Sequence, residues 1–134
     1  MVILSSCNMT DGDRLANAAA RGETEKVEEL LKEGVHPNTL NRFGRTPLQC
    51  MMMGNVQIAE LLLAHGANPN IKDSYDTSPV HDAARAGFLE SVQLLIKYGA
   101  VANIRDSWNK LPVDLAREEG HQDVVDFLKC YSSS

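Results

Sequence analysis

The chain has 134 residues, 43% of them hydrophobic and 23% charged, which is enough for one domain with a core and is not the composition of a disordered segment. Its formal net charge of -5 argues against nucleic acid and anionic membrane as partners, because phosphate binders normally present a basic face. We therefore expect no nucleic-acid partner and no membrane partner. A basic protein surface is the better candidate.

The ends and the cysteines predict an intracellular protein. The opening residues MVIL have neither the basic flank nor the cleavage pattern of a signal peptide, and no later stretch approaches the length of a membrane span. Cys7, Cys50 and Cys130 are odd in number and widely spaced, which favours reduced thiols over a disulfide framework or a zinc site. We expect no metal and no cofactor, and an unmodified sequon at 8–10.

An internal repeat organises most of the chain. One set of prolines recurs at separations of 32 and 33 residues, and one set of glycines at separations of 32, 33 and 33. These residues are Pro47, Pro79 and Pro112, and Gly22, Gly54, Gly87 and Gly120. Self-similarity at such a period is typical of a repeat architecture. We assign four repeats, between tails at 1–12 and 132–134. Their approximate bounds are 13–42, 43–75, 76–108 and 109–131.

The first repeat predicts two short helices and a turn. Three alanines precede Gly22, and small residues let neighbouring helices approach closely. The next stretch, TEKVEELLKEG, has apolar residues at i, i+3 and i+4, which predicts an amphipathic outer helix. Gly34 suits the left-handed position that follows a helix. The residues after it predict a hairpin-like finger, with Gly44, Asp76 and Asn109 at equivalent turn positions in successive fingers.

The second repeat departs from the pattern. Thr46 and Pro47 predict a helix start, as Ser78 and Pro79 do in the third repeat. Only six residues separate Pro47 from the following glycine, however, against seven in the next two repeats. One missing residue rotates the rest of a helix by about 100°, so we expect this inner helix to shrink to a turn or become irregular. The methionine run at 51–53 cannot face one core, and it favours either packing repair or a contact surface.

The third repeat carries a carboxylate where the fourth has Leu115. This residue, Asp82, has no internal partner that the sequence demands, so it is available to an arginine or lysine of another protein. A salt bridge to Arg85, three residues on, is the alternative, and such exposed pairs are worth only about 0.2–0.5 kcal/mol. Both interpretations stay open from the residues alone.

A unit of about 33 residues with Thr-Pro-Leu at a helix start, Ala-Ala before a glycine and Gly-Ala-x-x-Asn after it resembles the ankyrin repeat. The resemblance covers roughly residues 13–131. It implies an all-α solenoid of four helix-turn-helix units with hairpin-like fingers, in which the inner helix of the second repeat is shortened. Such solenoids present their concave face to protein partners.

Three stretches narrow the resemblance. They are similar to the ankyrin-repeat inhibitors of the cyclin D-dependent protein kinases. The stretches are PLQCMMMGN with AELLLAHGANPN, then PVHDAARAGFLE, and then RDSWNKLPVDLA. A further short stretch, NRFGR, is most similar to the four-repeat members of that family. This resemblance implies a monomeric protein that is not an enzyme. It would bind a monomeric cyclin D-dependent kinase beside its catalytic cleft, oppose cyclin and ATP binding, and so restrain the cell cycle from the cytoplasm and the nucleus.

The resemblance also implies a set of kinase contacts on the concave side of repeats two and three. Asp82 corresponds to the central contacting acid of the family, with Arg85 as a contact or an orienting partner. Asp73 and Glu25 match further contact positions, although Glu25 is equally well explained as a favourable acid near a helix N-terminus. The apolar part of the interface is assigned to Phe43, Met51, Met52 and Met53.

No catalytic residue is expected. His81 lies at the ankyrin position where histidine is structural and bonds to the finger backbone. Its neighbour Asp82 points elsewhere on a helix, and no motif places a nucleophile beside them. The other histidines have no cysteine at ligand spacing, and no nucleotide loop occurs. Trp108 is expected to pack against the third repeat. The second functional hypothesis is an ankyrin scaffold with a different protein partner, such as a transcription factor.

Overall fold

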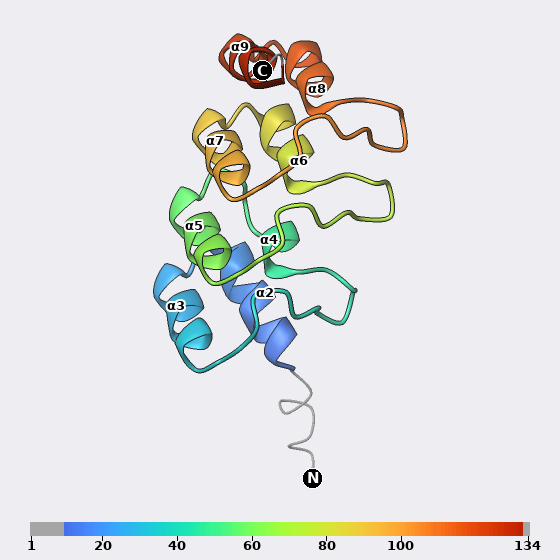
Figure 1. The fold of residues 1–134 in the computed structure, drawn as a ribbon. Coiled ribbons are helices and arrows are strands. Elements are labelled where there is room, and N and C mark those ends of the chain that lie inside the picture. The colour runs from blue at the N-terminus through green and yellow to red at the C-terminus, as the bar shows by residue number, and fades with distance from the viewer. Residues whose placement is uncertain (1–9, 133–134) are drawn as a thin grey trace. The chain divides into compact units, whose positions relative to one another are not determined.

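The structure, a computed structural model, describes residues 10–132, and this range contains eight helices and no strand (Figure 1). The all-α class is therefore confirmed. The predictions for Cys7, for the sequon and for residues 1–9 fall outside the described residues. The helices are α2 (Asp11–Arg21), α3 (Thr24–Lys32), α4 (Pro47–Cys50), α5 (Val56–Ala64), α6 (Pro79–Ala86), α7 (Leu89–Lys97), α8 (Pro112–Glu118) and α9 (Gln122–Ser132).

The helices form two compact units that divide after Ala67. In the first unit, α2 packs against α3 and α4, and α5 packs against α3 and α4. One apolar stripe of each helix closes the core, because burying such a stripe is what stabilises a short amphipathic helix. The most deeply buried large side chains here are Leu15, Val27, Leu30, Leu48, Ile58 and Leu62, all no more than 1% exposed.

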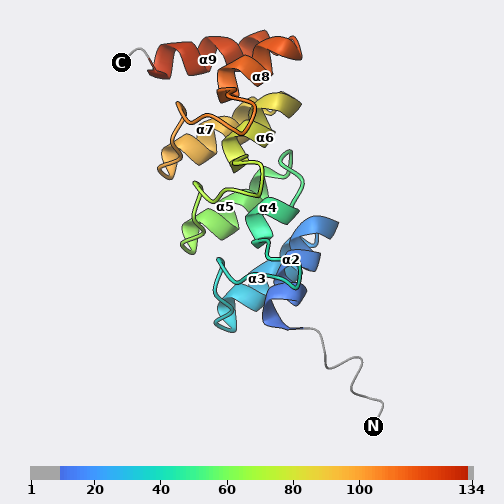
Figure 2. The ribbon, with the colours of Figure 1, turned by 90° about the vertical axis from the view of Figure 1, so that its right-hand side faces the viewer.

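The second unit repeats this arrangement. Helix α6 packs against α7 and α8, and α9 packs against α8 and α7, as the neighbouring ribbons of Figure 2 show. Its deepest side chains are Val80, His81, Val92, Leu95, Val124 and Leu128. The one polar member of this set, His81, is 0% exposed.

The first helix of each pair begins with the same side-chain hydrogen bond. The side chain at the third helical position accepts a hydrogen bond from the backbone N–H of the residue before the helix, which satisfies one of the amides that a helix start leaves without a partner. Thr46 and Ser78, predicted as caps, both directly precede their helices. The Thr46 hydroxyl accepts the Gln49 N–H at 3.3 Å, as predicted, whereas the Ser78 side chain makes no such cap hydrogen bond. The four donor–acceptor pairs are Thr10–Asp13 (3.4 Å), Thr46–Gln49 (2.8 Å), Ser78–His81 (3.1 Å) and Leu111–Asp114 (3.0 Å).

Each finger is closed by one side chain that accepts two backbone N–H groups. In the first finger Asn41 Oδ1 accepts from Phe43 (2.9 Å) and Arg45 (3.0 Å). The predicted turn residues all have positive φ, at 74° for Gly44, 56° for Asp76 and 62° for Asn109. A positive φ suits glycine, asparagine and aspartate best, so the turn chemistry agrees with the sequence.

No helix within residues 10–132 combines the length and the apolar composition needed to cross a membrane.

Candidate functional site

Helix α6 presents the charged pair that the sequence singled out. Asp82 Oδ1 lies 2.6 Å from Arg85 Nη2, and the two side chains are 36% and 53% exposed. The equivalent position in α8 holds Leu115, which is 8% exposed. An exposed pair of this kind contributes at most about 1 kcal/mol, so a guanidinium or ammonium from another protein can join or replace Arg85 at little cost. The pair is therefore chemically suited to a cationic partner.

His81 fixes the start of this helix and is structural, as expected. Its Nδ1 accepts the Ser78 N–H at 3.1 Å, so the ring proton is on Nε2, which donates to the Lys110 carbonyl at 3.1 Å. Both nitrogens are thus used, one within α6 and one to the next finger. Because the His81 imidazole fixes the start of α6, it also fixes the position of Asp82 on that helix. Both ring nitrogens of His81 are engaged in these hydrogen bonds, so neither is left for proton transfer.

Asp13 performs the same task in the first unit, and sequence reasoning missed it. Its side chain is 6% exposed, and Oδ1 accepts the backbone N–H of Arg42 at 2.9 Å. This backbone hydrogen bond holds the pKa of Asp13 below its usual range, and the Arg42 guanidinium at 3.4 Å from Oδ2 adds to the effect. In both units a capping side chain reaches a finger residue 29 positions later. That shared spacing is the signal that could have found it.

Asp73 closes its finger. Its Oδ1 accepts the N–H groups of Tyr75 (2.8 Å) and Thr77 (2.9 Å), in the same pattern that Asp106 shows in the following finger. The structure thus gives Asp73 a local role that is independent of any partner. Its assignment as a kinase contact stays a prediction. The equivalence of Asn41, Asp73 and Asp106, spaced by 32 and 33 residues, already carried this information in the sequence.

Two aromatic side chains of neighbouring fingers stack in the second unit. The rings of Tyr75 and Trp108 have centroids 5.3 Å apart and planes inclined by 28°, and the Ser107 N–H donates to the Tyr75 carbonyl at 2.9 Å. Trp108 packs on the finger that leads into the third repeat, yet it is 61% exposed. Tyr75, which is 56% exposed, was not recognised from the sequence.

The methionine run divides by burial. Helix α4 ends at Cys50, and Met51 has an extended backbone with φ -72° and ψ 161°. Met51 and Met53 are 5% and 8% exposed, whereas Met52 is 71% exposed. The extended backbone of Met51 ends the helix, and a turn follows in which the Met52 carbonyl accepts the Asn55 N–H at 3.0 Å. Two methionines therefore fill the core, as packing repair requires, and one is presented to solvent. The assignment of Met51, Met52 and Met53 as a contact surface stays a prediction.

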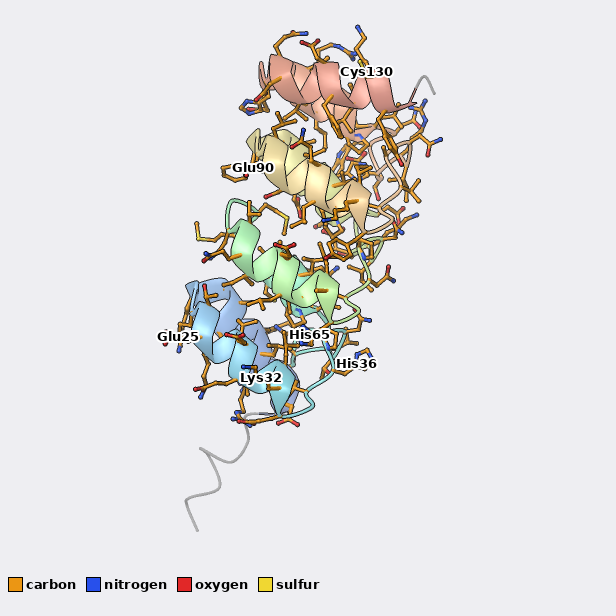
Figure 3. All side chains as sticks on the ribbon, turned by 60° about the vertical axis from the view of Figure 1, so that its left-hand side comes forward. Glu25, Lys32, His36, His65, Glu90 and Cys130 are labelled. Atoms are coloured by element: carbon orange, nitrogen blue, oxygen red, sulfur yellow. The ribbon has the colours of Figure 1, made fainter. Side chains whose placement is uncertain are left out.

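The remaining assigned residues of the first unit lie on different elements. Phe43 is on the first finger and is 78% exposed, the largest exposure among the large apolar side chains of the described residues. Glu25 is an exposed acid in the first turn of the outer helix α3 (Figure 3). The structure thus gives Phe43 an accessible apolar surface and gives Glu25 the helix N-terminal position that its alternative explanation requires.

Potential metal ligands are scattered in the part of the chain that the structure describes. No group of three or more potential ligands comes together among residues 10–132. Burial raises the pKa of the Cys50 thiol, so little thiolate forms there.

Comparison with known proteins agrees with this architecture. The family pattern described as ankyrin repeats (3 copies) matches residues 15–106 and 67–134. The chain is 63% identical over 79 residues to cyclin-dependent kinase 4 inhibitor B of Bos taurus, covering 58% of this chain and 60% of that protein. It is 57% identical over 81 residues to cyclin-dependent kinase inhibitor 2A of Homo sapiens, covering 60% and 52%. A putative ankyrin repeat protein of Fowlpox virus is 41% identical over 69 residues, covering 49% and 12%.

The aligned parts thus span about 60% or less of these relatives. The family pattern, in contrast, extends over nearly the whole chain and coincides with the helix pairs and fingers described above. The chain belongs to the ankyrin-repeat family, and its sequence is similar to those members that are named inhibitors of cyclin-dependent kinases.

Proposed function

We propose that this chain is a stoichiometric inhibitor of a cyclin D-dependent protein kinase and a negative regulator of the cell cycle. The observation that carries the proposal is the 57–63% identity to proteins named for inhibition of cyclin-dependent kinases. The inhibitor acts by binding rather than by catalysis. It works as a monomer in the cytoplasm and the nucleus, on the kinase without its cyclin.

Each unit offers a patch of the right chemistry. In the second unit, Asp82 and Arg85 supply a half-exposed charge pair on a helix whose start is locked by His81. In the first unit, Phe43 and Met52 supply exposed apolar surface on rigid backbone turns. Apolar side chains and an arginine are both enriched in protein interfaces, so each patch has a composition that a protein partner can bind.

The proposed mode of inhibition places these patches beside the catalytic cleft of the kinase, on the side away from the cyclin. Bound there, the inhibitor holds the two kinase lobes out of their productive alignment, and both cyclin capture and ATP binding weaken. Two binding events that need incompatible arrangements of one protein are negatively coupled, so cyclin must in turn weaken inhibitor binding.

The test is a pull-down with purified kinases, comparing cyclin D-dependent members with other cyclin-dependent kinases, followed by titration of two variants. Asp82→Asn removes the carboxylate charge but keeps the shape of the side chain. Losing one partner of a desolvated charge pair costs about 2–5 kcal/mol, so we expect binding to weaken by about 30-fold or more. Glu90→Gln is the matched control, because it removes an exposed charge from the first turn of the outer helix α7 (Figure 3).

Equal binding of Asp82→Asn and Glu90→Gln, with both proteins folded by circular dichroism, removes Asp82 from the central role. Failure of the unmodified chain to bind any cyclin D-dependent kinase contradicts the proposed function itself. The result then favours the second hypothesis, an ankyrin scaffold for a different protein such as a transcription factor.

A further inference from the structure

Met52 is held outside the core by its backbone. The Met51 N–H donates to the Pro47 carbonyl at 3.0 Å, and the Met52 carbonyl accepts the Asn55 N–H at 3.0 Å. Asn55 is itself fixed, since its Oδ1 accepts the Ile58 N–H at 3.1 Å and caps α5. Turning the Met52 side chain inward would require this chain of hydrogen bonds to break. Its 71% exposure is therefore a property of the fold and not of one rotamer.

The neighbouring sulfur atoms are protected. Met51 and Met53 are 5% and 8% exposed, so an oxidant in water cannot reach their thioethers without local unfolding. Cys50 is partly buried, and burial raises the pKa of its thiol, which keeps it from forming the reactive thiolate. Within the TPLQCMMMGN segment, Met52 is thus the one sulfur presented to a soluble oxidant.

We infer that Met52 is a reversible oxidation site at which a peroxide-class oxidant switches partner binding off. The thioether sulfur attacks one peroxide oxygen, the O–O bond breaks, and a sulfur–oxygen bond forms. Sulfur loses two electrons, and the second peroxide oxygen leaves as water. Methionine sulfoxide reductases reverse the change, which makes the modification suitable for regulation.

Oxidation changes the surface without disturbing the core. Sulfoxide is polar and chiral, whereas the thioether is a flexible apolar group, so a partner that buries Met52 must then desolvate an S=O group. The regulatory half of this inference rests on the proposed function, because it requires Met52 to lie in the kinase interface. The fold itself loses nothing, since the sulfur makes no buried apolar packing at 71% exposure.

The first experiment locates the modification. The folded chain is treated with dilute hydrogen peroxide, quenched and digested, and fragment-ion mass spectrometry reports sulfoxide separately at each methionine over time. We expect Met52 to be modified at least about tenfold faster than Met51 and Met53 in the native state, and at the same rate as they are in urea. Equal rates at all three positions in the folded protein overturn the assignment.

The second experiment measures binding to the cyclin D-dependent kinase before and after peroxide, with two variants at the same position. Met52→Leu keeps the apolar volume but cannot be oxidised, and Met52→Gln imitates the polar sulfoxide. We expect peroxide to weaken the unmodified chain by about tenfold and a methionine sulfoxide reductase to restore it. Met52→Leu, compared with itself before and after treatment, should show no change of binding in peroxide, and untreated Met52→Gln should bind about tenfold more weakly than untreated Met52→Leu.

The variants separate the possible failures. Loss of binding in peroxide-treated Met52→Leu assigns the effect to another residue, such as the exposed Cys130, and overturns the inference. Undiminished binding of the oxidised chain overturns it too. If the untreated chain binds no such kinase, the proposed function fails together with the regulatory half, while the mapping still decides whether Met52 is the oxidation site.

Discussion

Single buried polar side chains connect the inner helices of this protein to its fingers. Asp13 and His81 each cap a helix and then bond to a finger residue 29 positions later, Asp13 to an N–H and His81 to a carbonyl. A buried polar group that loses its partner costs about 1–3 kcal/mol, so both residues stabilise their unit and also determine where the finger lies. Asp82 inherits its position from this framework.

Acid should weaken the first unit through Asp13. Because the pKa of its carboxyl is lowered in the folded state, its stabilising contribution is complete above the ordinary value of 3.8 and is lost as the pH falls through the lower folded value. Asp13→Asn keeps an oxygen for the Arg42 N–H but removes the charge. In urea titrations we expect this variant to be less stable than the unmodified chain at pH 7, with a difference that shrinks at acid pH.

Asp11→Asn is the matched control, because Asp11 lies in the same turn, is 65% exposed and pairs only at 3.3 Å with Arg14. Its effect should be small at every pH. A stability difference for Asp13→Asn that grows in acid contradicts the assignment.

At the scale of elements, the chain after Thr46 illustrates how a local deletion changes a helix. Helix α4 has four residues and α6 has eight, although both begin with a cap and a proline. With one residue fewer before the glycine, the chain cannot continue the helix and still bury apolar groups on one side. It leaves the helix at an extended Met51 and turns back over residues 52–55, which buries Met51 and Met53. The sequence posed an exposed methionine and an irregular helix as alternatives, and the structure contains both.

Hydrogen exchange should therefore be fastest in the second repeat. Starting a helix is unfavourable, and a helix of one turn forms very few hydrogen bonds to offset that free energy. Its backbone hydrogen bonds therefore open more easily than those of a two-turn helix. We expect the amides of Cys50, in α4, and of Met51, directly after it, to be protected at least about tenfold less than those of Ala84 and Arg85 in α6. Equal protection in native-state exchange would contradict this ranking.

At the scale of the whole molecule, charge adds to the proposed interaction. The chain carries a net charge of -5, and a basic partner surface would be attracted over roughly a Debye length, about 8–10 Å at ordinary ionic strength. Such attraction accelerates encounter more than it prolongs the complex. The charge distribution is thus expected to appear in the association kinetics.

Salt should slow the binding of the cyclin D-dependent kinase. When sodium chloride is raised from about 50 to about 500 mM, we expect the association rate constant to fall several-fold and the dissociation rate constant to change less. Surface-based kinetics with both proteins purified would measure the two constants. An association rate that does not respond to salt would show that the net charge has no part in the encounter.

The sequence by itself determined the repeats, the capped helix starts, the finger turns and the ankyrin family, because each depends on residue chemistry within a few positions and on its recurrence after 32 or 33 residues. It also identified Asp82 as an acid at a position where the fourth repeat has leucine. In the structure this side chain is 36% exposed.

The tertiary structure alone decided which methionine is exposed, that Asp73 closes a finger, and that Asp13 and His81 reach residues 29 positions away. These properties depend on which backbone atoms packing brings within hydrogen-bond distance and on which side of the segment after α4 meets the core. The local preference of a residue for helix or strand determines neither its hydrogen-bond partner nor its burial, because both depend on neighbours that are remote in the sequence.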